Sequence, residues 1–152
     1  MKRISLLLFF CLCPCLIWAV TPVQNAVSMY RDVKGAKDYE ISGAMMSMAR
    51  PFLKYYSIGP LAPGVEQMFM LNMEKTDGKV RDDFEKTLSR IFQEYVYVGK
   101  TDTPNGVVDA YIHFRTSDLV DELVIYNPAI YSLYSLKGEF SVSDLREIGK
   151  KG

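Results

Sequence analysis

The sequence has no cysteine beyond position 15 and a single histidine, His113. Because Cys11, Cys13 and Cys15 all lie in the apolar start of the chain, the remainder offers no thiol for a disulfide, a metal ion or nucleophilic catalysis. The motifs Gly-x-Ser-x-Gly, Ser-x-x-Lys and His-Glu-x-x-His do not occur, and neither do the glycine patterns of nucleotide-binding loops. The sequence therefore disfavours hydrolases, metalloenzymes and nucleotide-binding proteins, and we expect no cofactor.

An excess of charge of one sign is also missing. The chain has 18 basic and 18 acidic residues, and the two signs are interspersed along it. Proteins that bind nucleic acids or anionic membranes concentrate lysine and arginine in a stripe or patch. We therefore expect neither a nucleic-acid partner nor an anionic membrane partner.

The first residues have the features of a secretory signal peptide. Lys2 and Arg3 precede an apolar run over residues 4–12, and Ala19 provides a small residue for cleavage. This pattern predicts a signal peptide over residues 1–19 and a mature chain that works outside the cytoplasm. Residues 20–152 are then long enough for a single α+β domain with one hydrophobic core.

Two other interpretations of the N-terminus are weaker. A transmembrane helix needs about 20 apolar residues, whereas the stretch over residues 4–20 is shorter, contains Pro14 and ends in a small-residue cleavage site. A lipid-modified cysteine follows small residues, but Phe10, Leu12 and Pro14 precede the three cysteines. We therefore expect a periplasmic or secreted protein without an integral membrane span, with an anchor formed by an uncleaved signal segment as the alternative.

The spacing of apolar residues changes from helical to strand-like along the chain. Helical spacing predicts helices over residues 23–34 and 80–95, a helix that begins or kinks at Pro51, and a short last helix from Ser141. Stretches with alternating or β-branched residues predict strands over residues 39–44, 65–74, 95–99, 107–115, 119–126 and 129–136. We therefore predict an α+β fold, a mostly antiparallel sheet of five or six strands with the first helix and the helix over residues 80–95 packed on one face.

The strand predicted over residues 107–115 carries most of the candidate binding residues. Alternation puts His113 on a polar face, opposite Ile112 and Phe114, and we expect the polar face to be exposed. Tyr111 of the same strand and the tyrosines that flank the Asn127–Pro128 turn extend this surface, because aromatic residues favour molecular contacts. The candidate binding residues are Asp109, Tyr111, His113, Tyr126 and Tyr131. A lone histidine can act as a general base, but no second residue lies at a catalytic spacing, so we predict no catalytic residue.

Methionine is abundant in this chain, and thioether sulfurs bind Cu(I) outside the cytoplasm. Met68 and Met70 share one face of the strand predicted over residues 65–74, whereas Met73 lies on the other face. Met68, Met70 and His113 are therefore the candidate metal ligands of an alternative hypothesis. Packing in the core is the simpler interpretation of these methionines, because the flexible side chain fills irregular gaps.

Acidic residues gather at one predicted turn. Asp118, Asp121 and Glu122 lie between two predicted strands, but their spacing matches no calcium-binding loop. We interpret this group as a solvated turn that hinders pairing between sheet edges.

The order of the segments resembles one uncharacterised bacterial family. Three stretches carry the likeness: Ile-Ser-Gly-Ala-Met-Met at residues 41–46, Leu-Val-Ile-Tyr at residues 123–126, and Tyr-Ser-Leu-Lys-Gly-Glu-Phe at residues 134–140. In these stretches the chain is similar to the domain-of-unknown-function family numbered 4252, which consists of small exported proteins. The resemblance implies a compact exported α+β domain, and it implies no activity, substrate or site residue.

The function that these observations favour is that of an exported, non-catalytic domain that binds another molecule. We expect a protein or ligand interaction module of the bacterial envelope whose partner is an envelope or secreted protein. A methionine-based Cu(I)-binding periplasmic protein is the first alternative, and a small hydrolase is the second.

The signal peptide can be tested on the exported protein. Because the charged start, the apolar run and Ala19 form a cleavage signal, intact-mass spectrometry should find a chain that begins close to Val20. An intact Met1 or an acylated cysteine would contradict this prediction.

Overall fold

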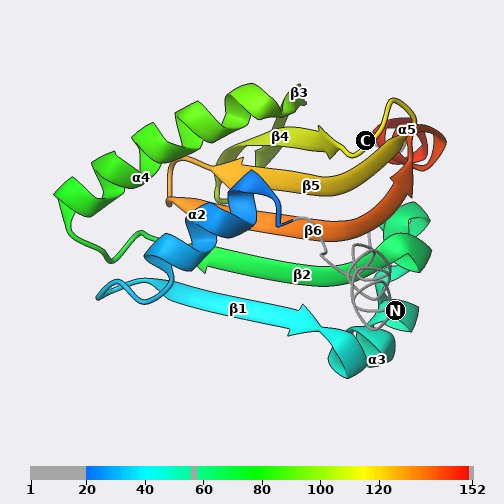
Figure 1. Cartoon of the computed structure of the whole chain (residues 1–152), viewed down its shortest axis with the longest axis horizontal. Helices are drawn as coiled ribbons and strands as arrows, with labels where there is room; N and C mark the ends of the chain where they lie inside the picture. The colour runs from blue at the N-terminus through cyan, green and yellow to red at the C-terminus, as the bar shows by residue number, and fades with distance from the viewer. Residues whose placement is uncertain (1–19, 56–57, 151–152) are drawn as a thin grey trace, which may run out of the picture.

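The computed structural model describes residues 20–55 and 58–150, so the predicted signal peptide lies outside the described residues. These residues form a six-stranded antiparallel sheet with the strand order β1-β2-β6-β5-β4-β3 (Figure 1). The strands are β1 (Lys37–Ser42), β2 (Val65–Asn72), β3 (Val96–Thr103), β4 (Gly106–Phe114), β5 (Leu119–Asn127) and β6 (Ser132–Ser141). The helices are α2 (Pro22–Tyr30), α3 (Gly43–Leu53), α4 (Gly78–Ile91) and α5 (Val142–Lys150), with the 3-10 segments η2 (Gly59–Gly64) and η3 (Phe92–Glu94). The predicted α+β class is confirmed, and none of the described helices is long and apolar enough to cross a bilayer.

Helix α2 begins where the sequence provides an N-terminal cap. The Thr21 hydroxyl accepts a hydrogen bond from the backbone N–H of Gln24 at 3.3 Å, and the Gln24 side chain accepts one from the backbone N–H of Thr21 at 3.2 Å. This reciprocal pair is a capping box, and Pro22 fits the first helical turn. The helix ends at Tyr30, before a turn at Gly35 whose φ of 92° favours glycine.

Helix α4 carries the apolar stripe that the sequence predicts. Asp77 caps its start by accepting a hydrogen bond from the backbone N–H of Lys79 at 2.9 Å. Phe84 and Leu88 are buried along one side of the helix. The α-helix ends at Ile91 rather than at residue 95, because the chain tightens into η3 before it enters β3.

Helices α2 and α4 pack on one face of the sheet, as predicted (Figure 1). The Phe84 ring lies between them and the sheet, and it meets Tyr30 of α2 edge to face at a centroid distance of 5.2 Å and Tyr126 of β5 at 6.2 Å. The buried residues of this α2–α4 core are Val23, Val27, Tyr30, Phe69, Leu71, Met73, Phe84, Leu88, Tyr95, Val124, Tyr126 and Leu133. Both helices and three strands thus share one hydrophobic core.

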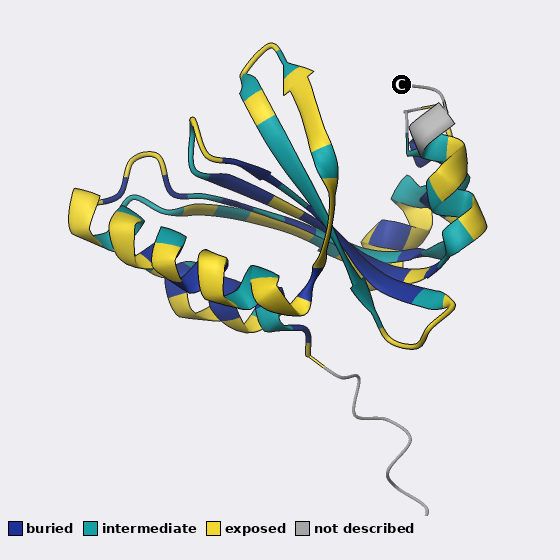
Figure 2. Ribbon diagram, turned by 90° about the horizontal axis from the view of Figure 1, so that it is seen from above, coloured by how far each residue is buried: buried dark blue, intermediate teal, exposed yellow. Residues whose placement is uncertain are grey.

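A second core lies on the opposite face of the sheet, towards the other end of the strands (Figure 2). Because side chains alternate along a strand, Leu133 contributes to the α2–α4 core and Leu136 to this second core. The buried residues of this α3–α5 core are Met46, Leu53, Leu61, Ala62, Val65, Val120, Leu123, Leu136 and Phe140, with Leu145 and Ile148 of α5 packed against them. Residues 59–64 form η2 and bury two of these side chains. The structure thus adds a second helical layer that the sequence analysis did not include.

The pairing register shifts at neighbouring positions of three strand pairs. The shifts lie between Val65 and Gln67 in β2–β6, between Val120 and Glu122 in β5–β6, and between His113 and Phe114 in β4–β5. An extra residue in one strand reverses the alternation of side chains beyond it. Val65 therefore packs in the α3–α5 core, whereas Phe69 of the same strand packs in the α2–α4 core.

The backbone of η2 approaches the backbone of β6 closely beside these register shifts. A Cβ atom on Gly138 would lie 1.9 Å from the carbonyl oxygen of Gly64, and one on Gly64 would lie 2.1 Å from that of Glu139. Only glycine fits at these two positions, so η2 lies directly against β6.

Phe84 tests the α2–α4 core. Its side chain is fully buried, so Phe84→Ala should leave a cavity and lower the free energy of unfolding by roughly 2 to 5 kcal/mol in urea denaturation. Lys86 is exposed on the same helix, and Lys86→Ala should change that free energy by less than about 0.5 kcal/mol. A loss below about 1 kcal/mol for Phe84→Ala would mean that this side of α4 does not face the core.

Candidate functional site

Four polar side chains lie directly opposite one another across β2, β6, β5 and β4. The cross-strand pairs are Gln67 with Lys137, Lys137 with Glu122, and Glu122 with His113. We name these four residues the polar row. They lie on the face that α2 covers, since Gln24 of α2 accepts a hydrogen bond from Lys137 at 2.7 Å and the Tyr95 ring contacts His113. The three register shifts lie beside the residues of the polar row. On one side of this row the sheet packs against the α2–α4 core, and on the other side it packs against the α3–α5 core.

Glu122 is the most deeply buried member of the polar row. Its side chain accepts hydrogen bonds from the Tyr95 hydroxyl at 2.5 Å and from the Ser135 hydroxyl at 2.6 Å. Burial raises the pKa of Glu122, although both hydrogen bonds favour the carboxylate. Burial also raises the pKa of Tyr95, and the neighbouring Glu122 adds to this effect. Both groups therefore keep their protons to a higher pH than they do in water.

His113 forms a close pair with a buried carboxylate. Its Nδ1 lies 2.6 Å from Oδ1 of Asp121, and its ring lies 5.0 Å from the Tyr95 ring, centre to centre. A histidine oriented by an aspartate can act as a general base, but such catalysis also needs a nucleophile or a bound substrate. Among the described residues, Asp121 is the one hydrogen-bond partner of His113. The geometry therefore shows a pair that joins β4 to β5, and no hydroxyl group of the described residues is hydrogen-bonded to the His113 ring.

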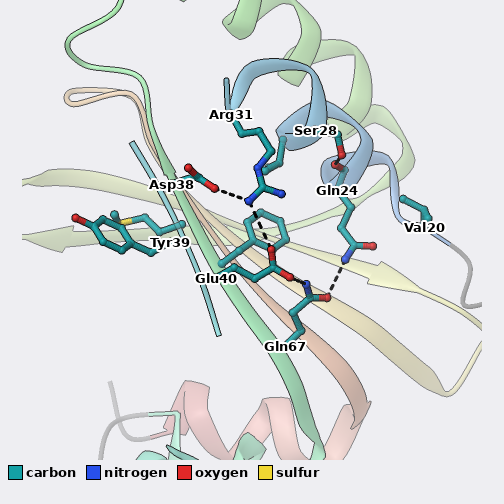
Figure 3. A pocket seen from close by; sticks show the side chains of 11 residues that line it. Val20, Gln24, Ser28, Arg31, Asp38, Tyr39, Glu40 and Gln67 are labelled. Carbon is teal, nitrogen blue, oxygen red and sulfur yellow. Dashed lines mark hydrogen bonds and ion pairs between the residues drawn. The ribbon is translucent and has the colours of Figure 1, made fainter. Parts of the chain in front are cut away.

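A groove of about 200 Å³ lies between α2 and the strands β1 and β2 (Figure 3). Arg31 reaches across it and forms an ion pair with Asp38 at 2.6 Å and a longer one with Glu40 at 3.7 Å. Gln67 donates a hydrogen bond to Glu40 at 2.6 Å, and Gln24 donates one to Gln67 at 3.0 Å. Each of these polar side chains thus binds another from a neighbouring element.

The hydrogen bonds of the groove continue into the polar row. Gln67 belongs to both, and Gln24 binds Gln67 through its amide nitrogen and Lys137 through its oxygen. Within the part of the chain that the structure describes, no buried side-chain nitrogen or oxygen lacks a hydrogen-bond partner. The network therefore needs no bound ligand to satisfy its polar groups, and it holds α2 on β1, β2 and β6.

The face of β4 that was predicted to be exposed is partly covered instead. The Tyr111 ring stacks on Phe92 of η3 at a centroid distance of 3.9 Å. Asp109 accepts a hydrogen bond from the Tyr97 hydroxyl of the neighbouring strand at 3.1 Å. The alternation along β4 was predicted correctly, but the segment after α4 folds over the side with the polar residues. Patterning alone assigns such a side to solvent, which is why the partial covering of Tyr111 and His113 was not predicted.

Tyr126 and Tyr131 do not complete an exposed surface either. Tyr126 is buried, and its hydroxyl donates a hydrogen bond to Glu85 at 3.1 Å. Tyr131 has a positive φ of 49° in the turn before β6, and the Arg81 guanidinium lies 5.2 Å from the centre of its ring. Three tyrosines of the predicted surface therefore pack in or against the α2–α4 core.

The candidate copper ligands lie on opposite faces of the sheet. Met68 packs against the α3–α5 core, whereas His113 contacts Tyr95 of the α2–α4 core. Met70 shares the face of Met68 by strand alternation. The structure thus does not bring the three predicted ligands together, and its described residues contain no group of three or more His, Cys, Asp or Glu side chains suited to a metal ion.

The interpretation of Asp121 and Glu122 as part of a solvated turn is wrong. Asp118 is exposed in the turn, but Asp121 and Glu122 lie in β5 and are buried. Sequence reasoning also missed Ser135 and Lys137 of β6, which are buried as well. The signal for these residues is a polar side chain inside an otherwise apolar strand, such as the Asp-Glu pair in the middle of β5.

The uncovered part of the sheet lies on the face opposite α2 and α4 (Figure 2). Tyr39, Met70, Tyr134 and Ile125 are cross-strand neighbours there, on β1, β2, β6 and β5. We name these four residues the open face. Tyr39 is 64% exposed and Tyr134 is 41% exposed, so this row presents two aromatic rings to solvent.

Comparison with known proteins adds no relative to this picture. No family model matches the chain, and neither a curated protein nor a solved structure matches it. The resemblance to the family numbered 4252 thus stays a prediction, and the functional argument rests on the residues of the chain itself.

Glu122 makes stability depend on pH in a defined direction. Its folded pKa is raised above the unfolded value of about 4.3, so the unfolded chain releases this proton first as the pH rises. The contribution of Glu122 to stability is therefore complete below the unfolded pKa and is lost as the pH rises towards the folded pKa. Glu122→Gln cannot ionise, so urea denaturation from about pH 4 to about pH 8 should show the variant gaining stability relative to wild type as the pH rises.

Glu94→Gln is the matched control for this measurement. Glu94 is exposed in η3, so the same chemical change there should give a much smaller pH dependence. A stability difference between Glu122→Gln and wild type that stays constant over this pH range would contradict the buried state of Glu122.

Proposed function

We propose that the protein is an exported, non-catalytic interaction domain of the bacterial envelope and that it binds a partner protein through the open face. The observation that carries this proposal is the exposure of Tyr39 and Tyr134 on a part of the sheet that no described helix covers (Figure 2). Exposed aromatic side chains beside aliphatic ones are typical of protein contacts, because their rings bury a large area and lose little conformational freedom. The partner we expect is an envelope or secreted protein with an apolar patch.

The internal bonding of the polar groups supports a non-catalytic role. The side chains of the polar row and of the groove bind one another, and this bonding accounts for their burial without a substrate. The His113–Asp121 pair is the feature nearest to a hydrolase site, but no hydroxyl group of the described residues is hydrogen-bonded to the His113 ring. The Cu(I) alternative gains no support, because its predicted ligands lie on two faces of the sheet.

The location in the envelope is supported by the sequence of residues 1–19. A charged start, an apolar run and a small residue at Ala19 favour export. The fold fits this location, because its stability rests on two hydrophobic cores and its described residues contain no cysteine that would respond to oxidation.

Site-specific photo-crosslinking in living cells tests the open face. We expect p-benzoylphenylalanine in place of Tyr39 or Tyr134 to form a covalent complex with a discrete partner protein, because both positions would lie in the contact. Tyr97 is also partly exposed but lies on the face of Tyr111, so the same replacement there is the matched control and should give no such complex.

Equal crosslinking from positions 39, 134 and 97, or none from positions 39 and 134, would remove the open face as the binding surface. A Tyr39→Ala, Tyr134→Ala double variant should lose the crosslinked partner in co-purification. Its unfolding free energy should change little, since each surface substitution typically contributes within about 0.5 kcal/mol.

A further inference from the structure

The segment around α3 has a composition unlike the rest of the chain. Residues 41–65 contain no Asp or Glu, although the whole chain has 18 acidic residues. The same segment contains two cations, Arg50 and Lys54. The even charge of the whole chain thus conceals a locally cationic stretch.

Helix α3 is apolar on its outer side as well as its inner side. The inner side places Met46 and Leu53 in the α3–α5 core. The outer side is formed by an apolar set that we name the outer stripe: Met45 at 62% exposure, Met48 at 75%, Phe52 at 65% and, just after the helix, Tyr55 at 77%. These residues recur at intervals of three and four, so they line one side of the helix. A helix that is apolar on both sides requires a second apolar environment beyond its own core.

Lys54 lies next to this apolar surface, whereas Arg50 extends from another side of α3 towards the start of β2. The Nε and Nη2 atoms of Arg50 both donate hydrogen bonds to the backbone carbonyl of Val65, at 3.1 and 2.9 Å, which fixes the charge beside α3. The Lys54 Nζ lies 5.1 Å from the centre of the Tyr55 ring, at the C-terminal end of the helix. Lysine beside an exposed aromatic ring suits a water–lipid boundary, where the apolar parts enter the lipid and the charge meets the headgroups.

We propose that the outer stripe docks α3 onto the surface of an anionic lipid bilayer. Its methionine and aromatic side chains enter the boundary between headgroups and acyl chains, and Lys54 attracts the anionic headgroups. An apolar stripe alone would suit several partners, and the absence of acidic residues over residues 41–65 is what selects an anionic surface. Few side chains insert, so the binding is weak and reversible. This surface is separate from the open face, so either proposal can fail while the other stands.

Fluorescence of a tryptophan placed in the outer stripe tests the proposal. Trp18 is the single tryptophan of the chain, so a Trp18→Phe, Phe52→Trp protein reports from position 52 alone. Phosphatidylglycerol vesicles should shift its emission to the blue. Uncharged phosphatidylcholine vesicles should bind more weakly, by up to about fivefold, because Lys54 loses its attraction to the headgroups. Equal affinity for both lipids would overturn the proposal, and so would a blue shift on concentrating the protein without lipid, which would indicate a second copy of the chain.

Matched glutamate substitutions locate the contact. Met48→Glu puts a carboxylate in the outer stripe and should weaken flotation with phosphatidylglycerol vesicles about tenfold or more. Met29→Glu makes the same change at a residue of α2 that is 66% exposed, and it should leave flotation unchanged. Because residues 1–19 are identical in these proteins, a difference between them reports on α3. Equal flotation of Met48→Glu and wild type would overturn the proposal.

Lys54→Glu is the second variant, and it keeps the proposal testable if Met48→Glu does not fold. It leaves the outer stripe intact and reverses one exposed charge. Its preference for phosphatidylglycerol over phosphatidylcholine vesicles should fall by about tenfold. An unchanged preference would overturn the proposal.

Discussion

The burial of Glu122 is the constraint on which the rest of this fold depends. A carboxyl group away from water must have hydrogen-bond partners, and the hydroxyls of Tyr95 and Ser135 provide them. Ser135 belongs to β6, and Tyr95 follows η3, so both segments must reach the same point of β5. The Tyr95 hydroxyl also accepts a hydrogen bond from the backbone N–H of Val23 at 3.3 Å, which ties the start of α2 to it. One acidic side chain thus links two strands, the connection between α4 and β3, and the N-terminal helix.

Elements whose local pattern agrees with their packing could be predicted from the sequence. The buried side of α4 and the strands β4 and β5 are examples, because alternation or helical spacing alone identifies them. The candidate site could not be predicted in the same way. Gln24 and Lys137 meet only because α2 lies over β6, and Tyr111 is covered only because η3 places Phe92 on it. No local pattern encodes either contact, and a polar side chain in an apolar strand was the one signal present.

The two faces of the sheet have different roles. The face under α2 and α4 contains the larger core, the groove and the polar row, and its polar groups bond to one another. The other face combines the smaller α3–α5 core with the open face and the outer stripe, whose large apolar side chains lie in solvent. Each face thus has its own core, and both proposed contacts lie on the face away from the polar row. A contact on the exposed side can therefore form without rearranging the buried network.

The strand order also governs when the sheet can be completed. β2 pairs with β1 on one side and with β6, the last strand of the chain, on the other. The consecutive strands β3, β4 and β5 can pair locally, but β2 keeps an unpaired edge until β6 is present. Pairing between such distant segments is slow, because the loop entropy is lost before the contacts form. A nascent chain of this topology stays incompletely folded until its C-terminal part has been synthesised, which is the state that a translocation channel for unfolded polypeptides requires.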